Sequence, residues 1–91
     1  MQIEIVEGPW KKGDHLAVSF LASIEEEEIL CRISFEALRD DYGAPNNSDP
    51  LALFEAKKSD ILRRTWLLRA SNIVLEDGRK VIEIGTGQGM A

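Results

Sequence analysis

The residues best suited to chemistry are one histidine, one cysteine and a run of four glutamates. His15 stands alone before an alternating apolar segment, and a histidine without a partner is more often structural than catalytic. Cys31 falls at an apolar position of a predicted strand, where a thiol is usually buried and inert. The run from Glu25 to Glu28 lacks the alternation and glycine turn of a calcium loop, so we interpret it as a solvated turn. We therefore expect no catalytic, cofactor-binding or metal-binding residues. This argues against enzyme activity, although sites assembled in three dimensions leave no such local signature.

Charge is distributed unevenly along the chain. The 91 residues carry a formal net charge of −5, but residues 49–71 hold five bases and three acids, whereas residues 1–48 hold ten acids and four bases. Nucleic-acid binding needs clustered Lys and Arg to neutralise phosphates, so the net charge disfavours it. Any anionic ligand would have to use the segment from 49 to 71.

That segment is predicted to be one long helix. Asp49 suits the N-cap and Pro50 the first helical position, and apolar residues recur at helical spacing, which predicts a stripe that packs on a sheet. Its members are Leu51, Phe54, Ile61, Leu62, Thr65 and Leu68. We expect Phe54 and Ile61 to be buried. Lys58 and Arg69 project into this stripe. Either their methylene stems cover the edge of the core, or they are candidate anion contacts lining a pocket.

The opposite side of this helix is the predicted interaction surface. Its members are Leu53, Lys57, Asp60, Arg63, Arg64 and Leu67. Small and apolar residues there would allow close approach of a partner, and arginines could reach the acidic turn of a second copy. Two alternatives stay open. Leu53 could pack on a neighbouring short helix and leave Leu67 singly exposed, or Lys57, Arg63 and Arg64 could contact a polyanion.

The remaining elements are short. Alternation predicts a first strand over Met1 to Glu7, broken by Gly8-Pro9, and a hairpin from Leu16 to Ile33. Ser34 caps a short helix from Phe35 to Tyr42, which Gly43 ends. Asp77-Gly78 predicts a turn between an arm at Ile73–Leu75 and a final strand at Lys80–Ile84.

These elements predict a single α+β domain over residues 1–91. Its small antiparallel sheet combines the hairpin with N- and C-terminal strands, and one long and one short helix cover it. Residues 1–14 form the N-terminal strand and loop, and residues 85–91 a flexible glycine-rich tail.

No signal peptide or membrane-spanning run is visible, and one cysteine cannot form an internal disulfide. We therefore expect a cytoplasmic protein that does not enter membranes.

The end of the chain resembles the first motif of Rossmann-like S-adenosylmethionine-dependent methyltransferases. Residues 81–89, VIEIGTGQG, read as a strand, an acid and a glycine-rich turn. The motif requires a helix after the turn, and none follows Gly89. We expect no bound cofactor here.

The central block resembles a second family. HLAVSFLASI, then CRISFEAL, then Asp49-Pro50-Leu51 leading into the long helix are similar to the bacterial domain-of-unknown-function family 1488, over roughly residues 15 to 84. The resemblance implies an α+β layout and a bacterial cytoplasmic setting, with no catalytic motif to carry over. Glu25 to Glu28 stand where that family is expected to have a glycine-containing turn.

Together these features predict a non-enzymatic protein that self-associates or docks on a protein partner through the outer side of the long helix. The alternative is a regulatory protein that binds nucleic acid or another anionic ligand through the basic face of that helix.

Overall fold

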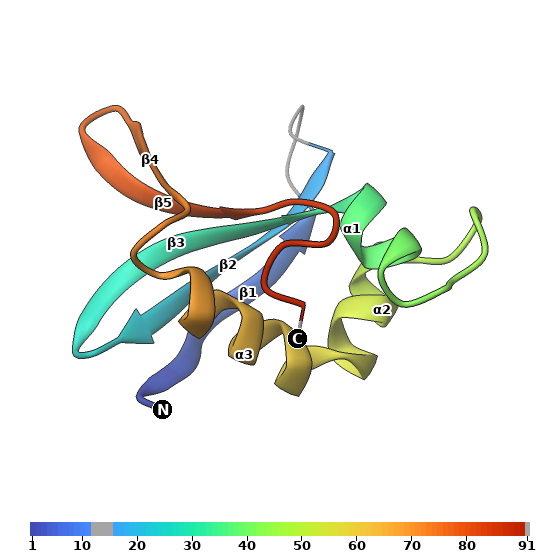
Figure 1. The fold of residues 1–91 in the computed structure, drawn as a ribbon, viewed down its shortest axis with the longest axis horizontal. Helices are drawn as coiled ribbons and strands as arrows, with labels where there is room; N and C mark the ends of the chain where they lie inside the picture. Colours follow the sequence, from blue (N-terminus) through green and yellow to red (C-terminus); the bar gives the residue numbers. More distant parts are fainter. Residues whose placement is uncertain (12–15, 91) are drawn as a thin grey trace.

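Five strands form one mixed sheet, and three helices cover one of its faces (Figure 1). The computed structural model describes residues 1–11 and 16–90, so His15 lies outside the described residues. The strands lie in the order β1-β2-β3-β5-β4. The predicted α+β class is confirmed. Within the described part of the chain, no helix is long and apolar enough to cross a membrane.

The predicted central hairpin is present as β2 (Ala17–Ile24) and β3 (Glu27–Ser34). The two strands pair antiparallel, with Phe20 opposite Cys31 and Val18 opposite Ile33. Glu25 and Glu26 form the two-residue turn, and both have positive φ, at 52° and 72°. Such turns match the twist of a hairpin but favour Asn and Gly, so two glutamates there carry backbone strain.

The first strand is longer than expected. β1 spans Ile3–Lys11 and passes through Gly8-Pro9, so the prediction that this dipeptide ends the strand is wrong. The pairing with β2 shifts register twice, between Ile5 and Glu7 and between Glu7 and Trp10. Gly8 has φ +98°, and a Cβ there would lie 3.1 Å from the Phe20 Cα atom. The strand therefore accommodates Gly8-Pro9 as an irregularity at the sheet edge, where such features are tolerated.

The sheet is mixed because one pairing is parallel. β5 (Arg79–Ile84) lies beside β3 in the same direction, with Leu30 opposite Val81 and Arg32 opposite Glu83. This corrects the prediction of a wholly antiparallel sheet. The chain leaves β3, crosses one face through the three helices and returns, which is the long connection that a parallel pair needs. β4 (Ile73–Glu76) then joins β5 through the predicted Asp77-Gly78 turn.

The long helix is in fact two helices. α2 (Pro50–Ala56) and α3 (Lys58–Leu68) are separated at Lys57, whose φ and ψ of −114° and 17° are not helical. Asp49 caps α2 through a hydrogen bond from the Leu51 backbone N–H, as predicted. The bend lets Phe54 of α2 and Ile61 of α3 both reach full burial on a twisted sheet. α1 (Phe35–Asp40) begins after Ser34, whose hydroxyl accepts from the Ala37 N–H.

The main core lies between the helices and the sheet. Phe54 and Ile61 are buried with Phe20 and Ile33, as the sequence predicted. The Phe20 and Phe54 rings have centroids 5.0 Å apart in a tilted arrangement, which is a favourable aromatic geometry. This contact packs α2 on β2.

Candidate interaction surfaces

Fewer of the predicted interaction residues are exposed together on the outer side of the helices than the sequence predicted. Leu53 is half-buried and packs against the core, whereas Leu67 is 54% exposed and Lys57 is exposed. The structure thus separates the two leucines that were expected to share one surface. Leu67 remains a single exposed leucine, which is ordinary on a protein surface.

Charges on this side neutralise one another. Asp60 accepts hydrogen bonds from the Arg63 side chain, with an Nη2-to-Oδ1 distance of 2.7 Å, and from the Tyr42 hydroxyl at 2.6 Å. The Tyr42 hydrogen bond, followed by Arg63, lowers the pKa of Asp60 despite some burial. Burial and the hydrogen bond to Asp60 raise the pKa of Tyr42. The Lys57 ammonium lies 5.7 Å from the centre of the Tyr42 ring. The cluster is a satisfied network and not a bare basic patch.

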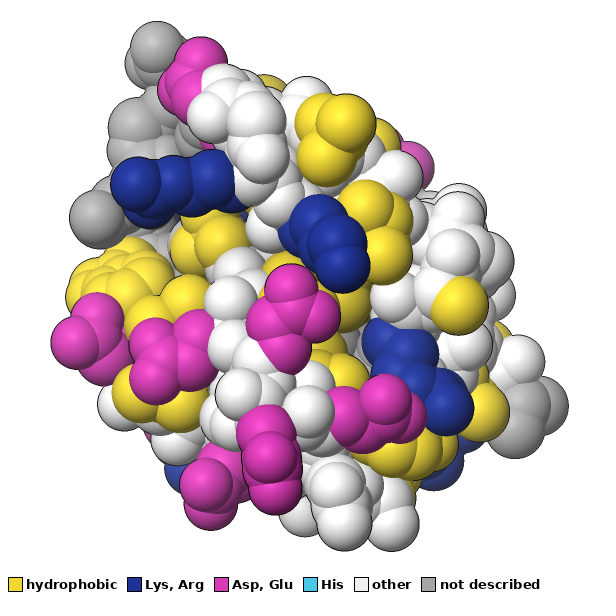
Figure 2. All heavy atoms as spheres, turned by 90° about the vertical axis from the view of Figure 1, so that its left-hand side faces the viewer, with side chains coloured by type: hydrophobic (Ala, Val, Ile, Leu, Met, Phe, Trp, Pro, Cys, Tyr) yellow, Lys and Arg dark blue, Asp and Glu magenta, His cyan; other side chains and the backbone are white. Residues whose placement is uncertain are grey.

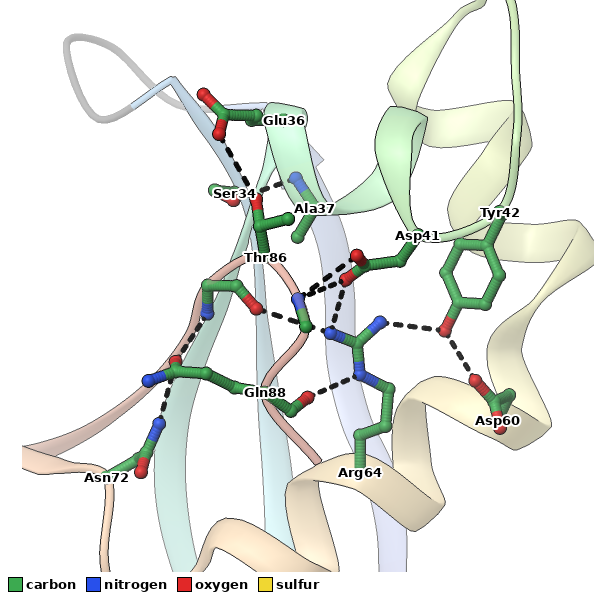
Figure 3. Close-up of polar contacts among 12 residues, drawn as sticks. Ser34, Glu36, Ala37, Asp41, Tyr42, Asp60, Arg64, Asn72, Thr86 and Gln88 are labelled. Atoms are coloured by element: carbon green, nitrogen blue, oxygen red, sulfur yellow. Dashed lines mark hydrogen bonds and ion pairs between the residues drawn. The ribbon is translucent and has the colours of Figure 1, made fainter. Parts of the chain in front are cut away.

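Arg64 is not on this surface. Its side chain has 0% exposure, so its predicted role in an outer interaction surface is wrong. The guanidinium donates to Asp41 at 2.7 Å, to the Tyr42 hydroxyl at 3.1 Å and to the backbone carbonyls of Gly85 and Gln88 (Figure 3). A buried charge is tolerated only when its donors are satisfied in this way. Helical spacing placed Arg64 beside Arg63, but it could not foresee that a distant segment covers it.

That distant segment is the glycine-rich tail. Residues 85–90 lie against α3, where the Gly85 and Gln88 carbonyls accept from Arg64. The flexibility that the sequence predicted for this tail stays a prediction. The Gln88 side chain accepts from the Gly85 N–H at 2.7 Å and from Asn72 at 2.9 Å, and the Gly87 N–H donates to Asp41. Figure 3 shows this turn meeting the end of α1 and the Arg64 side chain. The glycines therefore serve a tight turn that supplies carbonyls to a buried arginine.

The two candidate anion contacts lie apart. The Lys58 Nζ atom lies 3.5 Å from the Glu55 Oε2 atom, and the two residues are three positions apart in the chain. The Arg69 Nε atom lies 3.1 Å from the Glu25 Oε1 atom, and the guanidinium lies 3.8 Å from the centre of the Trp66 ring. Each base already has an acidic partner, so the structure does not bring them together as an anion pocket.

Sequence reasoning missed the exposure of β4. Each of its four residues is exposed, and the exposed fractions of Ile73, Val74 and Leu75 are 36%, 39% and 74%. β4 is also an outer strand of the sheet. A hollow of about 410 Å³ lies beside it, lined in part by Ile24, Ile29 and Ile73. The signal that could have indicated this surface was the apolar run before the Asp-Gly turn. The sequence alone does not show whether other elements cover such a run.

Cys31 and the acidic side chains are the remaining candidates for chemistry among the described residues. Cys31 is fully buried, and burial raises the pKa of its thiol to about 12. Among residues 1–11 and 16–90, no three His, Cys, Asp or Glu side chains gather so that they could hold a metal ion. Several acidic side chains spread over the end of the molecule that carries the hairpin turns, mainly over the lower half of Figure 2.

Comparison with known proteins places the chain in one family. No match to this chain was found among the curated proteins or among the solved structures. The model of a family described as "Protein of unknown function (DUF1488)" matches residues 11–69, which is well over half of the chain. These residues run from the end of β1 to the end of the helix pair, and they include the hairpin, the Ser34 cap and the Asp49-Pro50 helix start. The chain therefore belongs to the DUF1488 family of proteins of unknown function.

Proposed function

We propose that this protein is a non-enzymatic, self-associating interaction module that forms a two-fold dimer through β4. The observation that carries the proposal is the exposure of Ile73, Val74 and Leu75 on an outer strand. An exposed apolar edge strand is a template for pairing with another strand, and natural proteins usually protect such edges.

The two edges of the sheet differ in this respect. β1 carries Glu4, Glu7 and Lys11 and has two register shifts, which are the usual protections of an edge. β4 has three apolar residues in succession and pairs regularly with β5. The contrast supports β4 as the edge that receives a partner.

The register of β4 suits a second copy of the same strand. Glu76 and Arg79 flank the two-residue turn, so Glu76 and Val74 direct their backbone groups toward β5. Ile73 and Leu75 therefore direct their N–H and C=O groups outward. An antiparallel partner centred on Val74 would pair Ile73 with Leu75 of the other copy, and Leu75 with Ile73. This arrangement makes four backbone hydrogen bonds around one two-fold axis, the commonest symmetry of homo-oligomers.

Side chains support the same register. Ile73 lines the hollow with Ile24 and Ile29, on the face that the helices cover. Leu75 of the second copy would lie beside Ile73 on that face, because cross-strand partners point to the same side. Arg69 and Lys80, with Glu25 and Glu27, also line this hollow, so its polar rim presents both signs of charge. A short strand pair buries less than a standard interface, so we expect dissociation in the micromolar range.

The measurement is molar mass by light scattering across a range of concentrations. We expect the parent to shift from monomer to dimer, Leu75→Glu to stay monomeric, and Leu67→Glu to behave like the parent. Both leucines are exposed, so neither substitution should unfold the protein. If Leu67→Glu alone abolishes the dimer, the helix surface is the interface and the β4 proposal is wrong. A parent that stays monomeric throughout rules out self-association.

The polyanion alternative has less support. Lys58, Arg63, Arg64 and Arg69 each lie within ion-pair distance of an acid, so binding a phosphate would first break an existing pair. The acidic remainder of the chain would repel the same ligand.

A further inference from the structure

The face of the sheet opposite the helices carries a second apolar surface. Leu21 lies opposite Leu30, Leu30 beside Val81, and Val81 opposite Val74, so the four side chains form a row across four strands. None of the four belongs to the core cluster that contains Phe54 and Ile61, but Val81 is itself buried, with 2% exposure. We call these residues the apolar row. The three helices lie on the other face and do not cover it (Figure 1).

Part of this row forms the floor of a hollow. Leu21, Leu30 and Val81 line a cavity of about 780 Å³ between the start of β3 and the β4–β5 hairpin. This volume falls within the usual range of about 300–1,000 Å³ for binding pockets. The charged residues around it are Glu27, Glu28, Glu76, Asp77, Arg79 and Lys80. Four acids and two bases give the rim a formal net charge of −2, although Glu76 is already paired with Arg32 and Glu27 with Lys80.

The chemistry of the hollow selects its ligand. An apolar floor with a charged rim is the arrangement of a protein–protein contact. A net-acidic rim repels phosphate groups, which argues against nucleic acids and anionic lipid surfaces. A basic segment with apolar side chains on one side would satisfy both the floor and the rim.

We propose that this hollow binds a basic amphipathic segment of a protein partner. Leu21 and Leu30, which are half-buried, receive its apolar side chains, while Glu28 and Asp77 face its lysines or arginines. The site is distinct from the β4 edge, because Ile73 and Leu75 point to the opposite face of the sheet, although Glu27, Ile29 and Lys80 line both hollows. Dimerisation through β4 would place two such hollows on the same side of one continuous sheet.

The test uses a synthetic helical peptide made only of leucine and lysine, with the leucines on one side. A second peptide has the same composition in an order that removes the apolar stripe. Binding is followed by fluorescence anisotropy of the labelled peptides at near-physiological salt. We expect the amphipathic peptide to bind the parent at least about tenfold more tightly than the reordered one, equivalent to about 1.4 kcal/mol.

Two matched variants separate the hollow from diffuse attraction to an acidic protein. Glu28→Lys and Glu55→Lys change the net charge equally, but Glu28 lines the hollow and Glu55 lies on α2, which packs on the other face. We expect Glu28→Lys to weaken binding about tenfold and Glu55→Lys less than about threefold. Equal effects of the two variants would overturn the proposal. So would failure of the amphipathic peptide to bind the parent, or equal binding of the two peptides.

A third variant tests the apolar floor. Leu30→Asp adds an acid, so attraction by charge alone would strengthen binding, whereas loss of the floor weakens it. We expect weaker binding, and stronger binding would contradict the proposal. Circular dichroism melting confirms that each variant is folded. If Leu30→Asp does not fold, the charge-matched pair still decides the outcome.

Discussion

Arg64 depends on neighbours that come from three separate parts of the chain. Asp41 and Tyr42 follow α1, and the carbonyls of Gly85 and Gln88 belong to the tail turn. Asp41 also accepts from the Gly87 N–H, so one carboxylate holds both the arginine and the turn. The Asp41 side chain is only 7% exposed. Removing it would leave the buried guanidinium with neutral acceptors in place of a carboxylate, and the Gly87 N–H without its acceptor.

We therefore expect Asp41→Ala to lower the free energy of unfolding by about 3–5 kcal/mol, the usual cost of breaking a buried pair from one side. Asp40→Ala is the control, because the neighbouring carboxylate is exposed and pairs with Arg39 at the surface. Its effect should stay below about 1 kcal/mol. Urea unfolding of the three proteins measures both values. Similar losses for the two variants would show that Arg64 does not need Asp41.

Because of Cys31, the free energy of unfolding should decrease at alkaline pH. Its folded pKa is raised from 9.0 to about 12 by burial. Above pH 9.0 the unfolded chain loses the thiol proton while the folded chain keeps it, so the unfolded state binds fewer protons. Stability should then fall by about 1.4 kcal/mol per pH unit until the folded pKa is reached.

Between pH 8 and about pH 10.5, the parent should lose about 2 kcal/mol more of its unfolding free energy than a Cys31→Ala variant. The pKa of Tyr42 is also raised, but Tyr42 is present in both proteins and its contribution cancels. Urea unfolding at the two pH values gives the comparison. Parallel pH dependences in the two proteins would mean that the Cys31 thiol is not protected from ionisation.

At the scale of elements, local sequence patterns predicted the features that depend on neighbouring residues. They did not predict the features that depend on long-range contacts. Alternation and the Asp-Gly dipeptide were sufficient for the central hairpin and for β5, because both signals act between neighbouring residues. The break at Lys57 has no glycine or proline to mark it, so helical spacing alone predicted one continuous helix. The course of β1 through Gly8-Pro9 likewise depends on pairing with β2, which a local breaker signal cannot include.

The β2–β3 turn offers a stabilising substitution. Glu26 has a φ of 72°, in the left-handed region that costs a residue with a side chain about 1–2 kcal/mol. Glu26→Gly should raise the free energy of unfolding by about 1 kcal/mol and the melting temperature by about 4–8 °C. Glu28→Gly is the control, because Glu28 lies in β3 and glycine weakens an extended strand. Calorimetry that shows both variants losing stability would mean that the turn is not strained.

For the whole molecule, the α+β class, the family and much of the core were accessible from the sequence, because amphipathic spacing reports burial against a sheet. The parallel β3–β5 pair and the cover over Arg64 were not, because both join segments far apart in the chain. The exposed β4 escaped prediction for a related reason. Whether an apolar run is covered depends on where every other element lies.

Hydrogen exchange tests the arrangement of the whole assembly. If copies pair through β4, the amides of Ile73 and Leu75 should exchange more slowly as protein concentration rises, because their N–H groups point outward. The Val74 amide already faces β5 and should change less. In Leu75→Glu, the Ile73 amide should lose this concentration dependence. Exchange at Ile73 that stays the same at every concentration of the parent would contradict the pairing.

The Arg64 contacts also set an order for events during synthesis. Arg64 is made 21 residues before Gly85 and 24 before Gln88, whose carbonyls it needs. Until those residues leave the ribosome, α3 cannot bury its arginine at low cost, so the helix layer should dock on the sheet late. The nascent chain would meanwhile expose the apolar side of α3. Chaperones that bind exposed apolar segments should therefore associate with this chain until residues 85–88 emerge, and should be released once the turn closes over Arg64.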